Sequence, residues 1–146
     1  MEESTFPLKL IVSTIVLSLL LVIGLYMWNS YDNDTTVVFC NVGQGDAAYI
    51  RIKNKIDMVV DGGPDNSVLA CLGKYMPFYD HTIELAFITH PQKDHYYGFL
   101  DILDHYHIKQ IFMNQLDSSN ESFSQLKEKL IKDHTSIVFP KTGTTL

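Results

Sequence analysis

The chain has 146 residues, of which 46% are hydrophobic and 19% are charged, and its formal net charge is -6. A chain of this length has room for one small domain. Its acidic balance argues against a protein that binds nucleic acid by charge alone, whereas phosphodiester chemistry assisted by bound cations remains open.

An uncharged apolar segment over residues 10–28 follows a short tail, residues 1–9. The segment is long enough to cross a bilayer as a helix, and Tyr26 and Trp28 stand at its far end, where aromatic residues mark a membrane interface. A cleaved signal peptide is the alternative, but the segment exceeds the usual length and no small-residue cleavage site follows it. The segment therefore predicts a transmembrane anchor.

The charges beside this segment predict its orientation. Lys9 precedes the segment, whereas Asp32 and Asp34 follow it. Because basic residues favour the cytoplasmic side of a membrane, we expect a single-pass protein whose soluble domain lies outside the cytoplasm.

The chain has two cysteines, Cys40 and Cys71, so one disulfide is possible in an oxidising compartment. Their spacing matches no zinc motif. Cys40 lies in an apolar strand pattern and Cys71 in an apolar helix pattern, so we expect two buried, unpaired thiols.

One domain, residues 36–146, is predicted after a polar linker at 29–35. Its patterns predict strands and helices in this order: strands at 37–41, 47–53 and 56–60, a helix from 65 or 66 to 76, a strand at 83–88, a helix at 100–107, a strand at 108–113, a helix at 122–133 and a strand at 135–139. The helix at 122–133 is expected to direct inward Phe123, Leu126, Leu130 and Ile131. Paired strands followed by alternating helices and strands indicate half of an α/β (α+β) sandwich.

A cluster of possible metal ligands follows the predicted strand at 83–88. His90, Asp94 and His95 lie within six residues, and Pro91 ends strand pairing, so these side chains fall at the carboxyl edge of a sheet. Imidazole and carboxylate groups suit zinc or manganese. The alternative is three solvated loop residues.

Two further turns carry polar residues at strand ends. Asp61 ends the predicted strand at 56–60 and is followed by two glycines, Gly62 among them, which allow a close backbone approach. The turn at 43–46 reads Gly-Gln-Gly-Asp, with Gly43, Gly45 and Asp46. Taken singly, each segment is also typical of an ordinary turn, and Asp61 of a helix cap.

The three segments together, at 39–47, 59–64 and 88–99, resemble in order and spacing the metallo-β-lactamase-like domain of ComEC-type competence proteins. The resemblance covers residues from about 37 to 146. It implies an αββα sandwich with metal ions at strand-end loops, of which we expect this chain to hold only the N-terminal half. Further ligands of that family, an Asp and a His, come from the second half.

The resemblance assigns roles to single residues. It implies that His90, Asp94 and His95 are metal ligands, with Asp94 also catalytic because it orients the nucleophile. Gln92 takes the middle ligand position, where the family has His or Asp. The other matching positions would support the site: Asp61 as the orienter of a ligand histidine, Asp46 as a polar contact, and Gly43, Gly45 and Gly62 in the turns.

The function implied is metal-dependent hydrolysis, with a metal-bound hydroxide attacking a phosphodiester, most naturally DNA during competence-type uptake. Zinc or manganese would be the cofactor. The membrane, DNA and other competence or membrane proteins would be the partners, at the bacterial cell membrane. Two alternatives remain: a catalytically impaired binding or scaffold module, favoured by Gln92 and by Asn41 in place of the family's Asp, and a small-molecule metallo-hydrolase.

Overall fold

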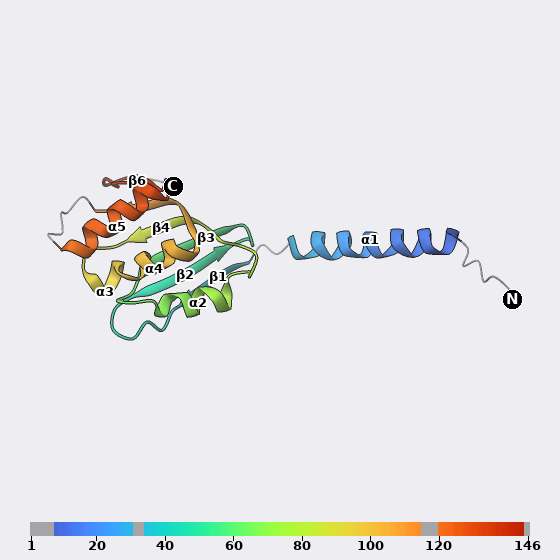
Figure 1. Ribbon diagram of the computed structural model, residues 1–146, viewed down its shortest axis with the longest axis horizontal. Coiled ribbons are helices and arrows are strands. Elements are labelled where there is room, and N and C mark those ends of the chain that lie inside the picture. Colours follow the sequence, from blue (N-terminus) through green and yellow to red (C-terminus); the bar gives the residue numbers. More distant parts are fainter. Residues whose placement is uncertain (1–7, 31–33, 115–119, 145–146) are drawn as a thin grey trace. The chain divides into compact units, whose positions relative to one another are not determined.

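The structure is a computed structural model that describes residues 8–30, 34–114 and 120–144. The chain forms two units, residues 1–33 and residues 34–146, which are described separately (Figure 1). Most of the predicted tail and the centre of the predicted linker, residues 31–33, lie outside the described residues.

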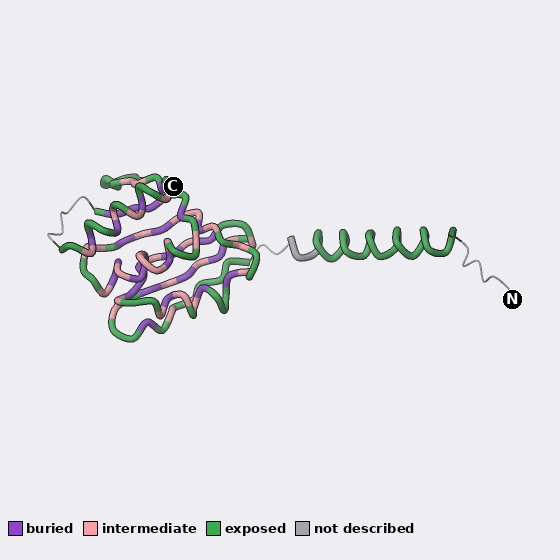
Figure 2. The backbone as a smooth tube through the Cα atoms, viewed as in Figure 1, coloured by how far each residue is buried: buried purple, intermediate pink, exposed green. Residues whose placement is uncertain are grey.

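The first unit contains one helix, α1 (Leu8–Ser30). Its segment Leu8–Met27 has a mean hydropathy of 2.6 and is exposed along its length, as Figure 2 shows. The helix is therefore long and apolar enough to span a membrane. Three of its hydroxyl groups are satisfied within the helix, because Ser13, Thr14 and Ser18 each donate to the carbonyl three residues earlier.

The second unit is built on one mixed sheet of six strands in the order β1-β2-β3-β4-β5-β6. The first three strands pair antiparallel, and the pairs from β3 to β6 are parallel. The strands are β1 (Thr35–Phe39), β2 (Ala47–Ile52), β3 (Ile56–Gly62), β4 (Thr82–Ile88), β5 (His107–Met113) and β6 (Ser136–Val138). The predicted α+β class is confirmed at this level.

The strand directions define two ends of the sheet. All strands except β2 run in the same direction. We call the end at which these five strands finish the C-terminal edge, and the end at which they begin the N-terminal edge. Loops that follow a strand therefore gather at the C-terminal edge, where open α/β sheets bind their ligands.

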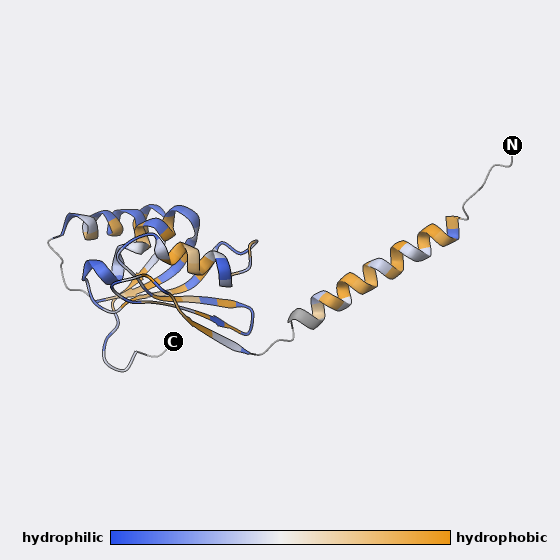
Figure 3. Cartoon of the chain, turned by 90° about the horizontal axis from the view of Figure 1, so that it is seen from below, coloured by the Kyte–Doolittle hydropathy of each residue, from blue (hydrophilic) through white to orange (hydrophobic). Residues whose placement is uncertain are grey.

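The helices of this unit lie on one side of the sheet (Figure 3). They are α2 (Ser67–Tyr75), α3 (Lys93–Tyr96), α4 (Gly98–His105) and α5 (Glu121–Lys132). Val59, Ala86 and Ile111 pair across three neighbouring strands, and each is fully buried in the core. Side chains alternate between the two faces of a strand, so these residues define the helix-covered face.

Local details differ from the predictions around the helices. Residues 93–96 form the short helix α3 where a turn was expected, and the next helix begins at Gly98 rather than at residue 100. The inward placement of Ile131 was wrong, because its side chain is 66% exposed. Ile131 lies about 100° around the helix from buried Leu130, and so falls beyond the apolar stripe of α5.

The opposite face of the sheet carries no helix (Figure 3) and is mostly apolar, with Gln110 and Ser136 as polar residues beside Leu85. The rings of Phe87 and Phe112, on neighbouring parallel strands, stack on it with centroids 4.9 Å apart. By register, the other residues of this face include Val37, Phe39, Ile50, Met58, Val60, Leu85 and Val138. None of these side chains is charged, and Phe39 is 86% exposed.

A charged cluster is buried on the helix-covered face. Asp57 is fully buried and accepts hydrogen bonds from the Tyr49 hydroxyl and the Arg51 guanidinium. Burial raises the pKa of the Asp57 carboxyl above its ordinary value, although both hydrogen bonds oppose the shift. Burying the negative charge of Asp57 therefore lowers the free energy of unfolding unless Arg51 stays paired with it.

Replacing Asp57 by leucine is expected to destabilise the protein by about 3–5 kcal/mol, because the buried Arg51 charge would lose its closest partner and keep the more distant Asp80 carboxylate, at 3.6 Å. The double variant Arg51→Met with Asp57→Leu removes both charges and should recover most of this loss. Urea unfolding of both variants measures the difference. Equal stability of the single and double variants would contradict this account of the pair.

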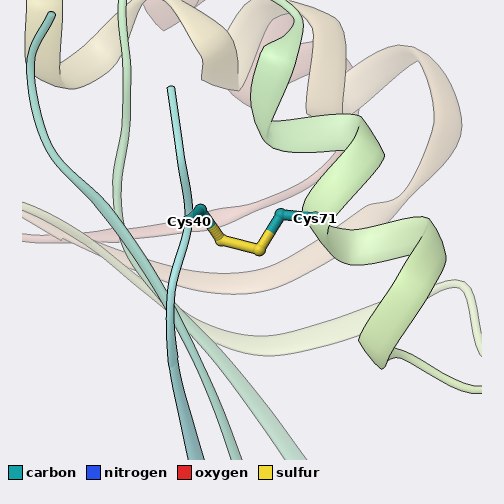
Figure 4. Close-up of a disulfide and its surroundings, with 2 residues drawn as sticks. All are labelled: Cys40 and Cys71. Carbon is teal, nitrogen blue, oxygen red and sulfur yellow. A yellow bond between two sulfur atoms is a disulfide. The ribbon is translucent and has the colours of Figure 1, made fainter. Parts of the chain in front are cut away.

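A disulfide joins Cys40, directly after β1, to Cys71 in α2 (Figure 4). The prediction of two unpaired thiols was therefore wrong. The packing of α2 beside the end of β1 brings the two Cα atoms to 5.6 Å, within the usual range for a disulfide. The bond restrains the chain where it leaves β1 and enters the turn at 43–46.

Reduction of this disulfide is expected to lower the free energy of unfolding by about 3–4 kcal/mol, since the bond closes a long loop in the unfolded chain. The two cysteines are 31 residues apart. Urea unfolding with and without a thiol reductant measures the effect. The double variant Cys40→Ala with Cys71→Ala is the control. Its free energy of unfolding should equal that of the reduced protein and should not change when the reductant is added.

Candidate metal centre

The predicted site residues meet at the C-terminal edge of the sheet. Asp61 is the penultimate residue of strand β3, and His90 follows the end of β4. Asp94 and His95 lie on α3, and Asp46 lies in the turn between β1 and β2. Three segments that are separate in sequence thus place their polar side chains at one end of neighbouring strands.

Asp61 is the centre of the hydrogen bonds at this edge. Its side chain is only 3% exposed, and its backbone has a φ of 57°, which aspartate tolerates better than most residues. One carboxylate oxygen accepts the Thr89 backbone N–H at 2.9 Å. The other accepts the Thr89 hydroxyl at 2.7 Å and lies 2.9 Å from His95 Nδ1.

The contact with Asp61 decides which nitrogen of His95 carries the proton. A carboxylate only accepts hydrogen bonds, so His95 Nδ1 is the donor and Nε2 keeps its lone pair. His95 is buried at 7% exposure. The nearest carboxylate oxygen of Asp94 lies 3.9 Å from Nε2, and that of Asp46 lies 3.9 Å from Nδ1. This arrangement is typical of a histidine prepared to bind a metal.

A second imidazole lies against His95. The ring centroids of His90 and His95 are 3.8 Å apart. His90 Nδ1 is 3.1 Å from the Thr89 hydroxyl, and its Nε2 is 3.1 Å from Gln92 Oε1. Gln92 therefore contacts the nitrogen that a metal ion would use. His90 can become a ligand only if its contact with Gln92 is broken.

The turn at 43–46 packs against the backbone of α3. Gly45 has a φ of 108°, and a Cβ atom there would lie 2.2 Å from the carbonyl oxygen of Asp94. Glycine is therefore required at this position both by conformation and by space. The Asp46 N–H donates to the same carbonyl at 3.4 Å, while Gly43 N–H donates to the Asn41 side chain at 3.3 Å.

The donor types at this edge fit a divalent cation such as zinc or manganese, since two imidazoles and several carboxylates are close together. Among the described residues, however, no three His, Cys, Asp or Glu side chains are arranged so that they could hold a metal ion as they stand. His90, Asp94 and His95 are thus neighbours whose donor atoms do not yet converge on one point.

The sequence did not single out Thr89 or Gly98, and both shape the site. Thr89 links Asp61 to His90 through its hydroxyl group. Gly98 donates its N–H to the Gly63 carbonyl at 3.0 Å and touches Gly62 closely, which holds α4 against the end of β3. The sequence signals these two contacts only locally. Thr89 directly follows an apolar strand, and Gly98 stands at the start of a helix.

The remaining histidines of the domain's second half lie away from this edge. His105, His107 and His134 are exposed, as expected for surface residues. His107 pairs with Asp133 at 3.0 Å near the N-terminal edge. These residues therefore provide exposed histidines for comparison with His90 and His95.

No family model and no curated protein matches this chain.

Proposed function

We propose that this protein is a membrane-anchored, metal-dependent hydrolase domain that acts on phosphodiesters, most naturally DNA during competence-type uptake. The observation that carries the proposal is the buried contact between Asp61 and His95, beside a second imidazole at the C-terminal edge of the sheet. Carboxylate–histidine pairs of this kind orient metal ligands in enzymes. The motif resemblance to ComEC-type metallo-β-lactamase-like domains supplies the reaction class.

The fold supports this proposal through its open face. In an αββα sandwich, each sheet carries helices on its outer side and packs its inner face on a second sheet. The helix-free face here is mostly apolar, with Phe87 and Phe112 stacked near the C-terminal ends of β4 and β5. We propose that it is the inner face of a metallo-β-lactamase-like sandwich, and that a second sheet from additional sequence or from a partner chain would cover it.

The residues of this chain would divide the work as follows. His90, Asp94 and His95 would hold a zinc or manganese ion, whose chemistry is to activate a bound water molecule for attack on phosphorus. Asp61 would keep the proton of a neutral His95 on Nδ1, which would leave the lone pair of Nε2 free to bind the ion. Asp94 would orient the attacking water, and Asp46 adds negative charge beside His95. The turn at 43–46 keeps Asp46 in place.

Two observations support a location for the domain. The apolar helix α1 supports a single-pass anchor, and the resemblance to competence proteins implies the bacterial cell membrane. The disulfide between Cys40 and Cys71 supports an oxidising compartment, since cytosolic thiols are kept reduced. We propose that the domain lies outside the cytoplasm, where incoming DNA and other competence or membrane proteins are its partners.

One observation favours a second function, a binding or scaffold module without hydrolysis. Gln92 occupies His90 Nε2 at 3.1 Å, and glutamine is a weaker zinc ligand than the His or Asp of the family. A domain with this residue could keep the fold and bind a partner while its metal affinity falls.

Hydrolysis of labelled single-stranded DNA by the full chain in detergent, with manganese or zinc present, distinguishes the two functions. The hydrolase proposal predicts cleavage that Asp94→Asn reduces by about 100-fold or more, because the nucleophile loses its orienting group. His105→Ala changes an exposed histidine on α4 and should cleave as the unaltered protein does. Intact DNA with the unaltered protein would contradict hydrolysis by this chain alone and favour the binding module.

A further inference from the structure

An exposed aromatic cluster marks the N-terminal edge of the sheet, the end opposite the candidate metal centre. Phe78 is 91% exposed and Tyr79 is 67% exposed, and their rings meet edge to face with centroids 5.4 Å apart. Tyr75, at the end of α2, is also exposed, and the Lys74 ammonium lies 4.9 Å from its ring centre. We call Tyr75, Phe78 and Tyr79 the aromatic tip.

The strand directions place the chain entry at the same edge. α2 starts after β3 and leads to the loop before β4, so the aromatic tip lies where β4 begins. Strand β1 also begins at this edge, at Thr35. The turn between β2 and β3 lies at this edge too, since the Lys53 N–H donates to the Asp34 carbonyl at 3.0 Å. Lys53 and Lys55 of this turn are both exposed.

This edge therefore combines exposed aromatic rings, lysines and the entry of the chain from the apolar helix. Tyrosine and other aromatic side chains favour the headgroup region of a bilayer, and lysines favour its anionic lipids. In the sequence, residues 31–33 separate Ser30, the last residue of α1, from Asp34, so the chain enters the domain at this edge.

We propose that the aromatic tip inserts into the headgroup region of the membrane in which α1 is anchored. The inference rests on the proposed anchor and goes beyond it, because it gives the domain one orientation on the lipid. The C-terminal edge, with His90 and His95, then faces the aqueous phase. A soluble polymer rather than a lipid would be the substrate that reaches it.

The test uses the full chain reconstituted in vesicles of zwitterionic and anionic phospholipid, part of it brominated in the acyl chains. Trp28, the single tryptophan, is replaced by phenylalanine, and a new reporter is introduced as Phe78→Trp. The matched control is Phe39→Trp, since Phe39 is 86% exposed and ends β1 at the opposite edge. Brominated lipid quenches only a tryptophan that reaches the bilayer.

Quenching at position 78 is expected to exceed that at position 39 by at least about two-fold. Vesicle flotation of both proteins reports anchoring separately. Flotation with equal quenching at the two positions, or with none at 78, would overturn the aromatic tip as a lipid contact and leave the anchor standing. Protein that fails to float with the vesicles would overturn the anchor and this inference together.

Discussion

Replacing His95 by alanine is expected to weaken zinc binding by at least about 100-fold. The substitution removes Nε2, the nitrogen whose lone pair is free because Nδ1 carries the proton that Asp61 accepts. Competition with a chromophoric chelator measures the affinity. Asp61→Asn keeps the imidazole but replaces the carboxylate that orients it, so a smaller loss of about 10- to 100-fold is expected.

The control for this prediction is His105→Ala, which removes an exposed histidine from the far end of α4. Its zinc affinity should equal that of the unaltered protein. Circular dichroism of each variant separates lost binding from lost folding, since His95 is buried and His105 is not. A His95→Ala protein that is folded and binds zinc as tightly as His105→Ala would exclude His95 as a ligand.

Gly98→Ala is expected to destabilise the domain by more than about 4 kcal/mol, an effect large enough to prevent folding of a typical small domain. A Cβ atom at Gly98 would lie 2.0 Å from the Gly62 carbonyl oxygen and 2.8 Å from that of Asp65. Both atoms belong to the backbone, so relief requires α4 to move away from the end of β3.

Gly73→Ala is the matched control, because Gly73 lies within α2 and a Cβ atom there meets nothing within 4 Å. Alanine should stabilise the helix by about 1 kcal/mol. Urea unfolding of the two variants gives the comparison, with yield of folded protein as the readout if Gly98→Ala does not fold. Similar stability of the two variants would contradict the close approach at Gly98.

Most of the strands and helices follow from local signals, which explains why they could be predicted. Helix α2 runs from Ser67 to Tyr75, close to the predicted range, because Asp65 accepts the Ser67 N–H at its start and Pro77 follows its end. Hydrogen bonds from the Ser67 hydroxyl and N–H lower the pKa of the Asp65 carboxyl, because they stabilise its charged form.

The order and pairing of the strands depend on contacts between distant segments, which periodicity does not encode. Cys40 and Cys71 illustrate this. The helix was predicted correctly for Cys71, whereas Cys40 lies directly after β1 rather than within it, and both residues are half-buried rather than buried. The packing of α2 beside the end of β1 decides that they bond. Ile131 shows the same limit, since a hydrophobic residue beside the stripe of α5 is exposed only because nothing packs there.

The candidate site, too, could be predicted from the sequence only in part. The motifs containing Asp46, Asp61 and His95 led to the expectation that these residues would gather at one edge, and the strand directions bring them there. The contact between Gln92 and His90, and the link through Thr89, depend on side-chain positions that no motif specifies. Metal binding and hydrolysis accordingly stay predictions.

The most direct test of the metal centre is the zinc content of the full chain after dialysis against a zinc buffer of low free concentration, measured by elemental analysis. The account predicts about one zinc ion per chain in the unaltered protein and little in His95→Ala. Zinc well below one ion per chain in the unaltered protein, or the same content in both proteins, would contradict a metal centre at the C-terminal edge.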